Sequence, residues 1–597
     1  MLFNLIFVYI FVASARPLRS TAKVLELIND DSELSALSSE EDEQNTTATG
    51  IQPHEGSDSA EGSSDSESDE EPLSSLISSR THWKCSESFS PLVTEFTMSA
   101  AHNDVDSRAD WEPVDYVKQY LDKDLFEILS HCTNVTSVAT KGKSLNTTPA
   151  EIERFLGACL FMSCINYPRV RMFWQKGLEV PVLTSAITRD RYFRIRNSLK
   201  TVIDTDISDE TKKHDRLWKV RPVLDRVRAG CLQISRDRDV SIDEQMIPFT
   251  GACELRQYVP NKPNPVGLKN FVAASHDGLV VDFVVYQGAN SFSSFPPELK
   301  LGIGGTVVAH LAETLQKGTC IYCDRYFTSP SLIEYMQSKE VYVTGTIMKN
   351  RVPGILDKLS SDKDLQKRGR GACDVVVRQD GKMAVVKWFD NKPIVMLSAI
   401  HAKNPEDECR RWSKKEKKYV MVKRPEVVRV YNSKMGGVDL CDRMISYYRM
   451  KTRTKKWTIR TMTHFFDLAV VNSWILYCRD KKILKVPRKD ILQFLQFKLQ
   501  IAQAYLAATD DCDDALHNSE DDSEEGPYAK RRRSVEVPAI PQRTSAAKHL
   551  PEMTDVKNSM RCRMPSCNSK SKVRCIACNV FLCMTCDRNC FLKFHKK

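Results

Sequence analysis

The chain has 597 residues, a net charge of +10 at pH 7 and a sequence pI near 8.7. This length excludes a single small core and predicts several domains. The charge is unevenly placed, with acidic runs near the start and around Asp510–Glu525 and basic character in the middle and the last third. Such asymmetry is typical of nucleic-acid-binding proteins that carry acidic arms.

Residues 1–16 form an apolar run that ends in small residues and resembles a secretory leader with a cleavage site. The run is shorter than the ~20 residues of a membrane-spanning helix, and it has no basic segment before it. The chain contains 20 cysteines, of which seven lie between Cys562 and Cys590 while most of the others stand alone. Scattered cysteines indicate a reducing compartment, so we expect the cluster to bind metal. The basic patch Lys530–Arg533 predicts that the chain is nuclear. A working leader peptide is the alternative.

Residues 1–109 are expected to be a disordered acidic region, because runs such as Ser64–Glu71 cannot bury enough apolar area to offset their ordering entropy. Order is expected from Trp111. Thr148–Glu151 is a capping box with Pro149 at the first helical position, and apolar residues follow at helical spacing. A second helix around Tyr192–Leu199 is flanked by arginines, which either contact DNA or form a solvated face. Residues 110–238 are therefore predicted to be a helical domain.

From Asp239 the periodicity changes to that of strands. Residues 241–249, 268–275 and 280–286 are predicted strands, followed by a helix at 307–315, a strand at 319–323, a helix at 331–337 and a strand at 341–347. This order predicts an α/β, RNase H-like sheet, in which Asp243 lies on the first strand and Asp324 ends a neighbouring central strand.

The remaining domains are predicted from shifts in composition. Residues 348–425 are predicted to be β-rich, with a meander at 374–378, 383–388 and 394–398, and residues 426–446 follow them. Residues 447–506 form a helical DNA-binding segment. Residues 507–557 form a disordered linker in which Lys530–Arg533 resembles a nuclear-import patch. Residues 558–597 form a Cys-rich finger, and residues 239–347 make up the first part of the core.

Four aspartates are candidates for metal-dependent catalysis. Asp243, Asp324 and Asp439 each adjoin an apolar or Gly-rich run, and Asp442 follows Asp439 on the same face of a predicted helix. Carboxylates brought to one point repel one another unless a cation neutralises them, and oxygen ligands suit Mg²⁺. Two such ions ~3.5–4 Å apart support in-line phosphoryl transfer. Aspartates beside apolar runs are common, however, and Asp442 has the alternative role of a charge favoured by the helix dipole.

The segments SIDEQMIPFTG (Ser241–Gly251), YCDRYFTS (Tyr322–Ser329) and MGGVDLCDRM (Met435–Met444) resemble, in order and spacing, the three catalytic blocks of piggyBac-type transposases. Tyr258–Lys269 and Val341–Ile347 also match that family. The resemblance implies an enzyme that holds two Mg²⁺ ions with Asp243, Asp324 and Asp439, with Asp442 as a further acidic residue. It implies cleavage of transposon ends and their joining to TTAA sites, by two protomers that bring the ends together. It also implies a helical dimerisation and DNA-binding domain before the core, an insertion domain at residues 348–425 and a return to the core at residues 426–446.

A basic run with one tryptophan follows the last of these blocks, at Tyr447–Arg460. Cations here suit DNA phosphates. Trp457 either stacks on an unpaired base or anchors the helix predicted at Met462–Tyr477. The residues predicted to contact DNA are Lys269, Arg449, Lys451, Arg453, Lys455, Lys456 and Trp457.

The C-terminal tail supplies eight zinc-type ligands, namely Cys562, Cys567, Cys575, Cys578, Cys583, Cys586, Cys590 and His595. Tetrahedral Zn²⁺ takes four ligands, so eight predict two ions. The resemblance implies a cross-brace finger, in which Cys562, Cys567, Cys583 and Cys586 share one ion and Cys575, Cys578, Cys590 and His595 the other. Two alternatives stay open: a catalytically silent DNA-binding or chromatin protein derived from a transposase, and a RING-like or PHD-like tail that binds proteins.

Overall fold

The computed structural model describes ten stretches of the chain: residues 82–97, 105–165, 167–260, 262–292, 295, 299–450, 454–509, 549–556, 558–585 and 587–596. The predicted leader, the acidic runs, the basic patch at Lys530–Arg533 and the predicted ligands Lys451, Arg453 and Cys586 lie outside these residues. The chain divides into two compact units. The first comprises residues 1–103, 234–245 and 270–443, and the second comprises residues 104–233, 246–269 and 444–597.

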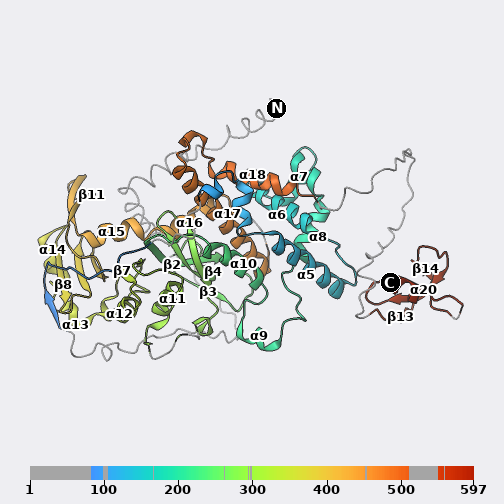
Figure 1. Cartoon of the computed structure of the whole chain (residues 1–597), viewed down its shortest axis with the longest axis horizontal. Helices are drawn as coiled ribbons and strands as arrows, with labels where there is room; N and C mark the ends of the chain where they lie inside the picture. The colour runs from blue at the N-terminus through green and yellow to red at the C-terminus, as the bar shows by residue number, and fades with distance from the viewer. Residues whose placement is uncertain are drawn as a thin grey trace, which may run out of the picture. The chain divides into compact units, whose positions relative to one another are not determined.

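The largest element is a mixed sheet of ten strands in the order β1-β8-β9-β10-β7-β6-β2-β4-β3, with β5 paired to β4 (Figure 1). Its strands are β1 (Trp83–Cys85), β2 (Asp239–Pro248), β3 (Arg256–Tyr258), β4 (Val266–Ser275), β5 (Val280–Val285), β6 (Cys320–Cys323), β7 (Tyr342–Thr346), β8 (Cys373–Arg378), β9 (Ala384–Phe389) and β10 (Pro393–Ser398). β2, β6 and β7 are parallel neighbours. Their sequences are almost continuously buried, as expected for parallel strands that are covered on both faces. The strands and helices predicted for residues 241–347 occur in the predicted order, and the short strand β3 is an addition that was not predicted.

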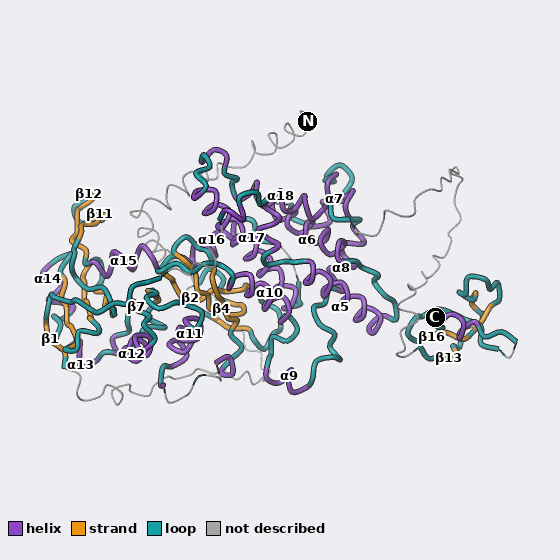
Figure 2. The backbone as a smooth tube through the Cα atoms, in the orientation of Figure 1, coloured by secondary structure: helices purple, strands orange, loops and turns teal. Residues whose placement is uncertain are grey.

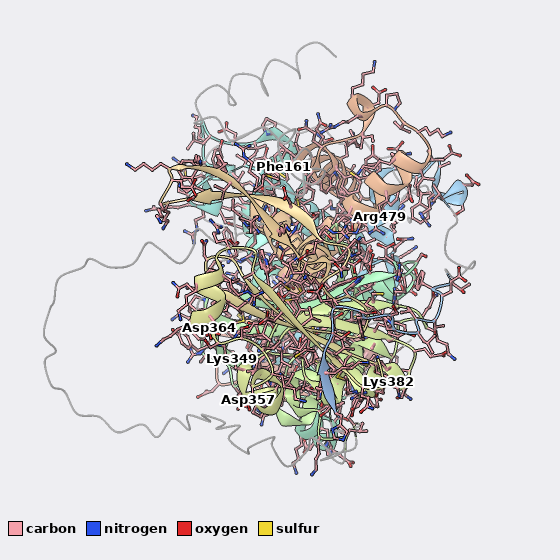
Figure 3. All side chains as sticks on the ribbon, turned by 90° about the vertical axis from the view of Figure 1, so that its left-hand side faces the viewer. Phe161, Lys349, Asp357, Asp364, Lys382 and Arg479 are labelled. Atoms are coloured by element: carbon pink, nitrogen blue, oxygen red, sulfur yellow. The ribbon has the colours of Figure 1, made fainter. Side chains whose placement is uncertain are left out.

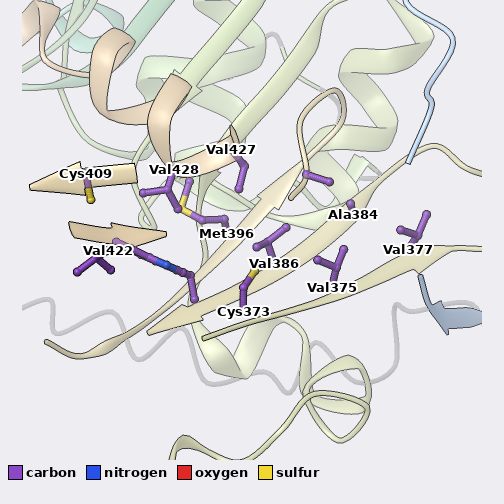
Figure 4. Packing of buried hydrophobic residues seen from close by; sticks show 12 residues of the cluster. Cys373, Val375, Val377, Ala384, Val386, Met396, Cys409, Val422, Val427 and Val428 are labelled. Atoms are coloured by element: carbon purple, nitrogen blue, oxygen red, sulfur yellow. The ribbon is translucent and has the colours of Figure 1, made fainter. Parts of the chain in front are cut away.

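The inserted strands do not form a separate sheet. β10 pairs antiparallel with β7, so the meander β8-β9-β10 extends the main sheet, whereas a domain of its own was expected. β7 would otherwise be an edge strand with unpaired backbone groups, and β10 satisfies them. A second, two-stranded sheet of β11 (Asp407–Ser413) and β12 (Lys418–Arg424) follows, and the sequence reading missed it. Figure 4 shows the buried cluster that joins both sheets, including Val386, Met396, Cys409 and Val422.

Helices of the first unit cover its sheet on two sides. Figure 1 shows α11 (Gly302–Ala312) and α12 (Pro330–Ser338) on one side and α15 (Glu426–Lys434) and α16 (Gly437–Tyr447) on the other. The short helices α13 (Pro353–Leu356) and α14 (Asp362–Arg368) precede β8. α12 begins where the Ser329 hydroxyl caps the backbone N–H of Leu332 at 3.1 Å, with Pro330 at the first helical position.

The second unit is helical before its Cys-rich tail apart from residues 246–269, as predicted for residues 110–238. The α-helices before the tail are α4 (Pro113–Lys118), α5 (Lys123–Lys141), α6 (Pro149–Cys164), α7 (Pro181–Ala186), α8 (Arg189–Ser198), α9 (Asp209–His214), α10 (Arg221–Leu232), α17 (Trp457–Ile483) and α18 (Phe494–Leu506). Thr148 caps α6 through the backbone N–H of Glu151, at 3.2 Å. The Glu151 carboxylate does not close the predicted capping box, because it pairs with Arg191 instead. None of the helices in the described stretches combines the length and apolar composition that crossing a membrane requires.

Two boundary predictions need correction. Residues 82–97 were expected to be disordered, but Trp83–Cys85 forms β1, which pairs with β8, and Trp83 is buried. Residues 549–556 were assigned to a disordered linker, but they contain β13 (Pro551–Met553), which pairs with β16 (Val573–Cys575) of the Cys-rich segment. Both strands are three residues long and take partners far away in sequence, so local periodicity cannot reveal them. β14 (Met560–Arg561), β15 (Lys570–Ser571) and α20 (Cys590–His595) complete that segment.

Candidate functional site

Asp243 and Asp324 directly follow the last registered pair of two parallel strands. β2 and β6 pair from Asp239 opposite Cys320 to Ile242 opposite Cys323. Each aspartate comes one residue later, so the two occupy the same step of adjacent strands, whose backbones lie ~4.8 Å apart. Asp243 is only 8% exposed and Asp324 is half-buried. The fold therefore brings together two carboxylates that are far apart in sequence.

The negative charges of both carboxylates affect the pKa values of Tyr431 and Cys323. Burial, followed by the negative charge of Asp324, raises the pKa of Tyr431, and Asp243 adds to the effect. Burial likewise raises the pKa of the Cys323 thiol to about 12, with contributions from Asp324 and Asp243. Both groups therefore stay protonated, and the phenol on α15 faces a region of negative potential.

The loop after Asp324 is braced by backbone contacts. The N–H of Tyr326 donates to Asp324 Oδ1 at 2.8 Å. Arg351 Nη1 donates to the carbonyl oxygens of Thr328 at 2.7 Å and Tyr326 at 3.0 Å. These bonds hold the Asp324 side chain and the loop Arg325–Ser329 in one arrangement, which is a requirement for preorganised ligands.

Helix α16 lies against the face of β2 that carries Asp243. Alternate residues of a strand share a face, so Ser241, Asp243 and Gln245 point the same way. A Cβ added at Gly437 would lie 2.2 Å from the Ser275 carbonyl oxygen and 2.7 Å from Ser241 Oγ, so only glycine fits the first residue of α16. At the other end of this face, Gln245 Nε2 donates to Asp442 Oδ1 at 2.8 Å.

Asp439 falls between these two contacts along α16. It lies in the first turn of the helix and is exposed, whereas Asp442 is half-buried. Gln245, which holds Asp442, accepts a hydrogen bond from Asn270 Nδ2 at 3.1 Å, and both amides are fully buried. The predicted fourth acid is thus fixed to the sheet through a buried amide pair, and Asp439 is left open to solvent.

The four aspartates do not form a compact single-ion site. Within the described stretches, the groups of three or more Cys, His, Asp or Glu side chains whose ligand atoms all lie within 4.8 Å of one another both belong to the Cys-rich segment. Two ions that share a bridging carboxylate spread their ligands over a wider region than one ion does. Strand register and the seating of α16 are the features that bring these carboxylates to the same part of the sheet.

The basic segment after α16 is anchored by a buried ion pair in the second unit. Lys498 Nζ contacts Asp467 Oδ1 at 3.0 Å and donates to the Tyr448 carbonyl oxygen at 2.5 Å. The N–H of Met450 donates to Asp467 Oδ2 at 2.9 Å. The backbone on either side of Arg449 is therefore fixed.

Positive charge gathers around this anchored segment. Arg449, Arg460 and His464 line one small pocket with Asp467. Burial and the two arginines lower the pKa of His464 to about 3, so the imidazole is neutral. The pKa of Lys456 is lowered by burial and by repulsion from Lys200 and Lys141.

The predicted DNA-contacting residues differ in accessibility. Lys455 and Lys456 are exposed, and Trp457, the first residue of α17, is half-buried. Lys269 lies within β4 and is only 9% exposed, so its burial disfavours the predicted contact with DNA phosphates. In the helical domain, Arg191 forms an ion pair with Glu151, whereas Arg194 is exposed.

The Cys-rich segment contains two four-ligand groups. One consists of Cys562, Cys567, Cys583 and Cys590, and the other of His549, Cys575, Cys578 and His595. Cys567 Sγ lies 3.8 Å from Cys583 Sγ, which matches the ~3.8 Å edge of a tetrahedron with 2.3 Å Zn–S bonds. Cys578 Sγ lies 3.2 Å from His549 Nδ1 and 3.5 Å from His595 Nε2. The residues present therefore fit zinc.

The thiols of these groups compete for protons. A hydrogen bond from Cys578 lowers the pKa of Cys575 to about 4, whereas burial raises the pKa of Cys583 to about 12. Four adjacent thiolates repel one another, and a bound Zn²⁺ would stabilise all of them. The Nδ1 of His595 contacts the Phe591 carbonyl oxygen at 2.7 Å, which leaves Nε2 for a metal.

The ligand grouping differs from the expected pairing. Cys590 joins Cys562, Cys567 and Cys583, although it was expected with Cys575, Cys578 and His595. His549 takes the fourth place in that second group. Cys590 begins α20 while His595 ends it, and a six-residue helix directs its two ends to different groups. His549 was missed because it precedes the first cysteine of the tail by 13 residues and belongs to no local spacing pattern.

The chain is similar in sequence and fold to transposases and transposase-derived proteins. Residues 112–474 match the family model described as Transposase IS4. The human PiggyBac transposable element-derived protein 3 is 27% identical over 483 residues, which cover 80% of this chain and 75% of that protein. The human PiggyBac transposable element-derived protein 2 is 27% identical over 431 residues, 70% of each chain. A piggyBac transposase, solved by cryo-EM as a synaptic complex with hairpin DNA, shares the fold with a TM-score of 0.56 at 21% identity, over 69% of this chain and 83% of its own.

Proposed function

Because the chain belongs to the piggyBac-type transposase family, we propose that it is a metal-dependent DNA transposase, or a recently domesticated derivative of one. It would cut transposon ends and join them to TTAA target sites. The observation that carries this proposal is the register of β2 and β6, which sets Asp243 beside Asp324, with α16 seated on the same face of β2. The core would accordingly be RNase H-like.

Asp243, Asp324 and Asp439 would hold two Mg²⁺ ions in this site. Bound Mg²⁺ would supply an activated water or 3′-hydroxyl and neutralise charge on the phosphate. Asp442 is tied to Gln245, so it would help to orient α16 and the open carboxylate of Asp439. Tyr431 stays protonated and would donate a hydrogen bond without adding negative charge beside the phosphate.

Further residues would bind and orient the DNA. Lys455, Lys456 and Arg449 would contact phosphates, and Trp457 would stack at the site of cleavage. The finger, with two Zn²⁺ ions, would recognise transposon-end DNA. The solved neighbour, a piggyBac transposase in a synaptic complex with hairpin DNA, supports a DNA partner. A homodimer would bring the two transposon ends together, and the basic patch Lys530–Arg533 would direct the chain to the nucleus.

The test is cleavage of a plasmid that carries the genomic segments flanking the coding region. We expect wild-type protein to cut it in Mg²⁺ and Asp243→Asn, Asp324→Asn or Asp439→Asn to cut at least about 10³-fold more slowly, while each still binds the plasmid. Asp357→Asn is the matched control, because Asp357 is an exposed aspartate near the start of the insertion (Figure 3).

Two outcomes would contradict the proposal in different ways. Normal cleavage by the three Asn variants would refute the assignment of the carboxylates. Tight DNA binding by the wild-type chain without any cleavage would instead indicate a silent DNA-binding protein of transposase origin.

A further inference from the structure

One face of the two-stranded ribbon β11–β12 packs against the rest of the fold, and the other face is exposed. Its strands pair in register from Asp407 opposite Arg424 to Ser413 opposite Lys418. Figures 1 and 2 show the ribbon extending away from the sheet strand β8. Because successive side chains point to opposite faces of a strand, the two faces of the ribbon carry different residues.

The inner face packs on the sheet. Cys409 and Val422 are 8% and 3% exposed and belong to the cluster with Trp388 and Val427. The cations on this face have carboxylate partners: Arg411 Nε contacts Asp390 at 3.0 Å, and Arg424 Nη2 contacts Asp407 at 2.6 Å. This face accounts for the stability of the ribbon.

The outer face exposes large side chains. Trp412, Tyr419 and Met421 are 48%, 55% and 59% exposed. Trp412 lies opposite Tyr419 with its ring edge-on at 5.1 Å, and Arg410 stacks over Tyr419 at 3.8 Å. Three described aromatic side chains are at least 48% exposed, and two of the three lie on this face. Clustered exposed aromatics indicate a binding surface rather than random solvent exposure.

The ribbon is also strongly basic. Residues 407–424 contain eight Lys or Arg against three Asp or Glu, a net charge of +5. Lys418 pairs with Glu416 at 2.9 Å. No ion pair involving Arg410, Lys415, Lys417 or Lys423 occurs among the residues that the structure covers. These cations cluster at the tip and along the aromatic face.

We propose that the outer face of β11–β12 binds DNA at an unpaired stretch, with Trp412 stacked on a base and Arg410, Lys415 and Lys417 on phosphates. Exposed aromatics flanked by cations are the combination that holds single strands. A protein partner fits less well, because lysine is depleted at protein interfaces. The inference rests on the proposed function, in that the chain handles DNA, and it assigns a role to the insertion.

The test uses the full chain carrying Asp243→Asn, so that the DNA is not consumed. Binding to a labelled 30-nucleotide single strand and to the matched duplex is measured by fluorescence anisotropy over a range of salt. We expect Trp412→Ala to weaken single-strand binding roughly 5- to 100-fold, with a smaller effect on the duplex, and Trp412→Phe to restore most of it. Lys415→Ala with Lys417→Ala should reduce the salt slope for the single strand by about 1.4.

The control removes two exposed lysines from neighbouring turns of the same insertion, with Lys382→Ala and Lys392→Ala; Figure 3 labels Lys382. This pair should leave single-strand affinity within about twofold of the parent, and thermal melting of every variant confirms that it is folded.

If the parent chain binds neither DNA, the proposed function fails. If the parent binds DNA but the ribbon variants bind like the control pair, only this inference fails. Equal loss of duplex and single-strand binding in Trp412→Ala would overturn the stacking assignment. A Trp412→Ala change in oligomeric state without a change in DNA affinity would show an interface between copies, and would also overturn it.

Discussion

The carboxylate site on β2 and β6 and the Cys/His groups of the tail are both candidate metal centres, but they are built in opposite ways. Asp243, Asp324 and Asp442 are held by strand register, backbone hydrogen bonds and buried amides. The described residues of the tail form short strands, one short helix and a small buried cluster in which five of the ten members are cysteines. The first centre is fixed by the protein framework, whereas we expect the second to depend on a bound metal. Loss of metal should therefore affect the two very differently.

The largest expected effect is on the tail. Structural Zn²⁺ contributes about 10–16 kcal/mol of apparent binding free energy at pH 7. A zinc chelator should therefore unfold residues 549–596 while β2, β6 and α17 stay folded, as measured by amide hydrogen exchange. Unchanged protection of the tail in the chelator would show that its folding does not depend on metal.

A second prediction tests which residues of the tail share each zinc ion. His549→Ser should lower the zinc content from two ions to one per chain, measured by elemental analysis, because His549 completes the second group. The exposed His276 offers the control His276→Ser, which should keep both ions. Two ions retained in His549→Ser would restore the pairing expected from the sequence.

The carboxylate site on β2 and β6 should be disrupted by a change in packing rather than by loss of metal. Gly437→Ala places a Cβ 2.2 Å from a backbone oxygen, so α16 must shift. We expect a destabilisation of about 2–4 kcal/mol and loss of DNA cleavage that added Mg²⁺ does not rescue, measured by denaturant unfolding and plasmid cutting. Gly436→Ala is the matched control, since a Cβ there meets nothing within 4 Å. Equal behaviour of the two variants would refute the close seating of α16.

A smaller effect, on the pH dependence of stability, is expected from His464, a buried histidine that lies outside both metal centres. The folded-state pKa of His464 is lowered to about 3 by burial and by Arg449 and Arg460. Above pH 6.5 the side chain is neutral in both states and contributes nothing to the pH dependence. Below pH 6.5 His464 becomes protonated in the unfolded chain but stays neutral in the folded chain. The free energy of unfolding therefore decreases as the pH is lowered towards about 3, by up to about 2 kcal/mol at pH 5.

This loss is measured as the difference between His464→Gln and the parent in unfolding free energy at pH 7 and pH 5. The variant should lose less stability on acidification than the parent. His214→Gln, on the exposed surface of α9, should match the parent. An identical pH dependence for all three proteins would show that His464 is not buried in its neutral form.

The sequence identified the elements whose signals are local. The strands around Asp243 and Asp324 contain Val, Ile, Tyr and Cys in short segments, and Pro149 and Pro330 mark helix starts, so these elements were predictable. Long-range pairing was not, because nothing near Trp83 or Pro393 specifies β8 or β7 as a partner. β11 and β12 were missed because their outward positions mix charged, aromatic and aliphatic residues, while Arg411 occupies an inward one. Lys269 could not be recognised as buried, since it is followed by Asn270 and two adjacent polar residues are typical of an exposed position.

The most direct measurement of the central claim is Fe²⁺-dependent backbone cleavage, in which Fe²⁺ takes the place of Mg²⁺ and generates hydroxyl radicals at its binding site. Asp243, Asp324 and Asp439 are proposed to share their cations, so the chain should be cut close to all three in one experiment. Asp243→Asn should then abolish all three cuts together. If Asp243→Asn removed only the cut beside residue 243 and left those beside Asp324 and Asp439, the carboxylates would not share a metal site.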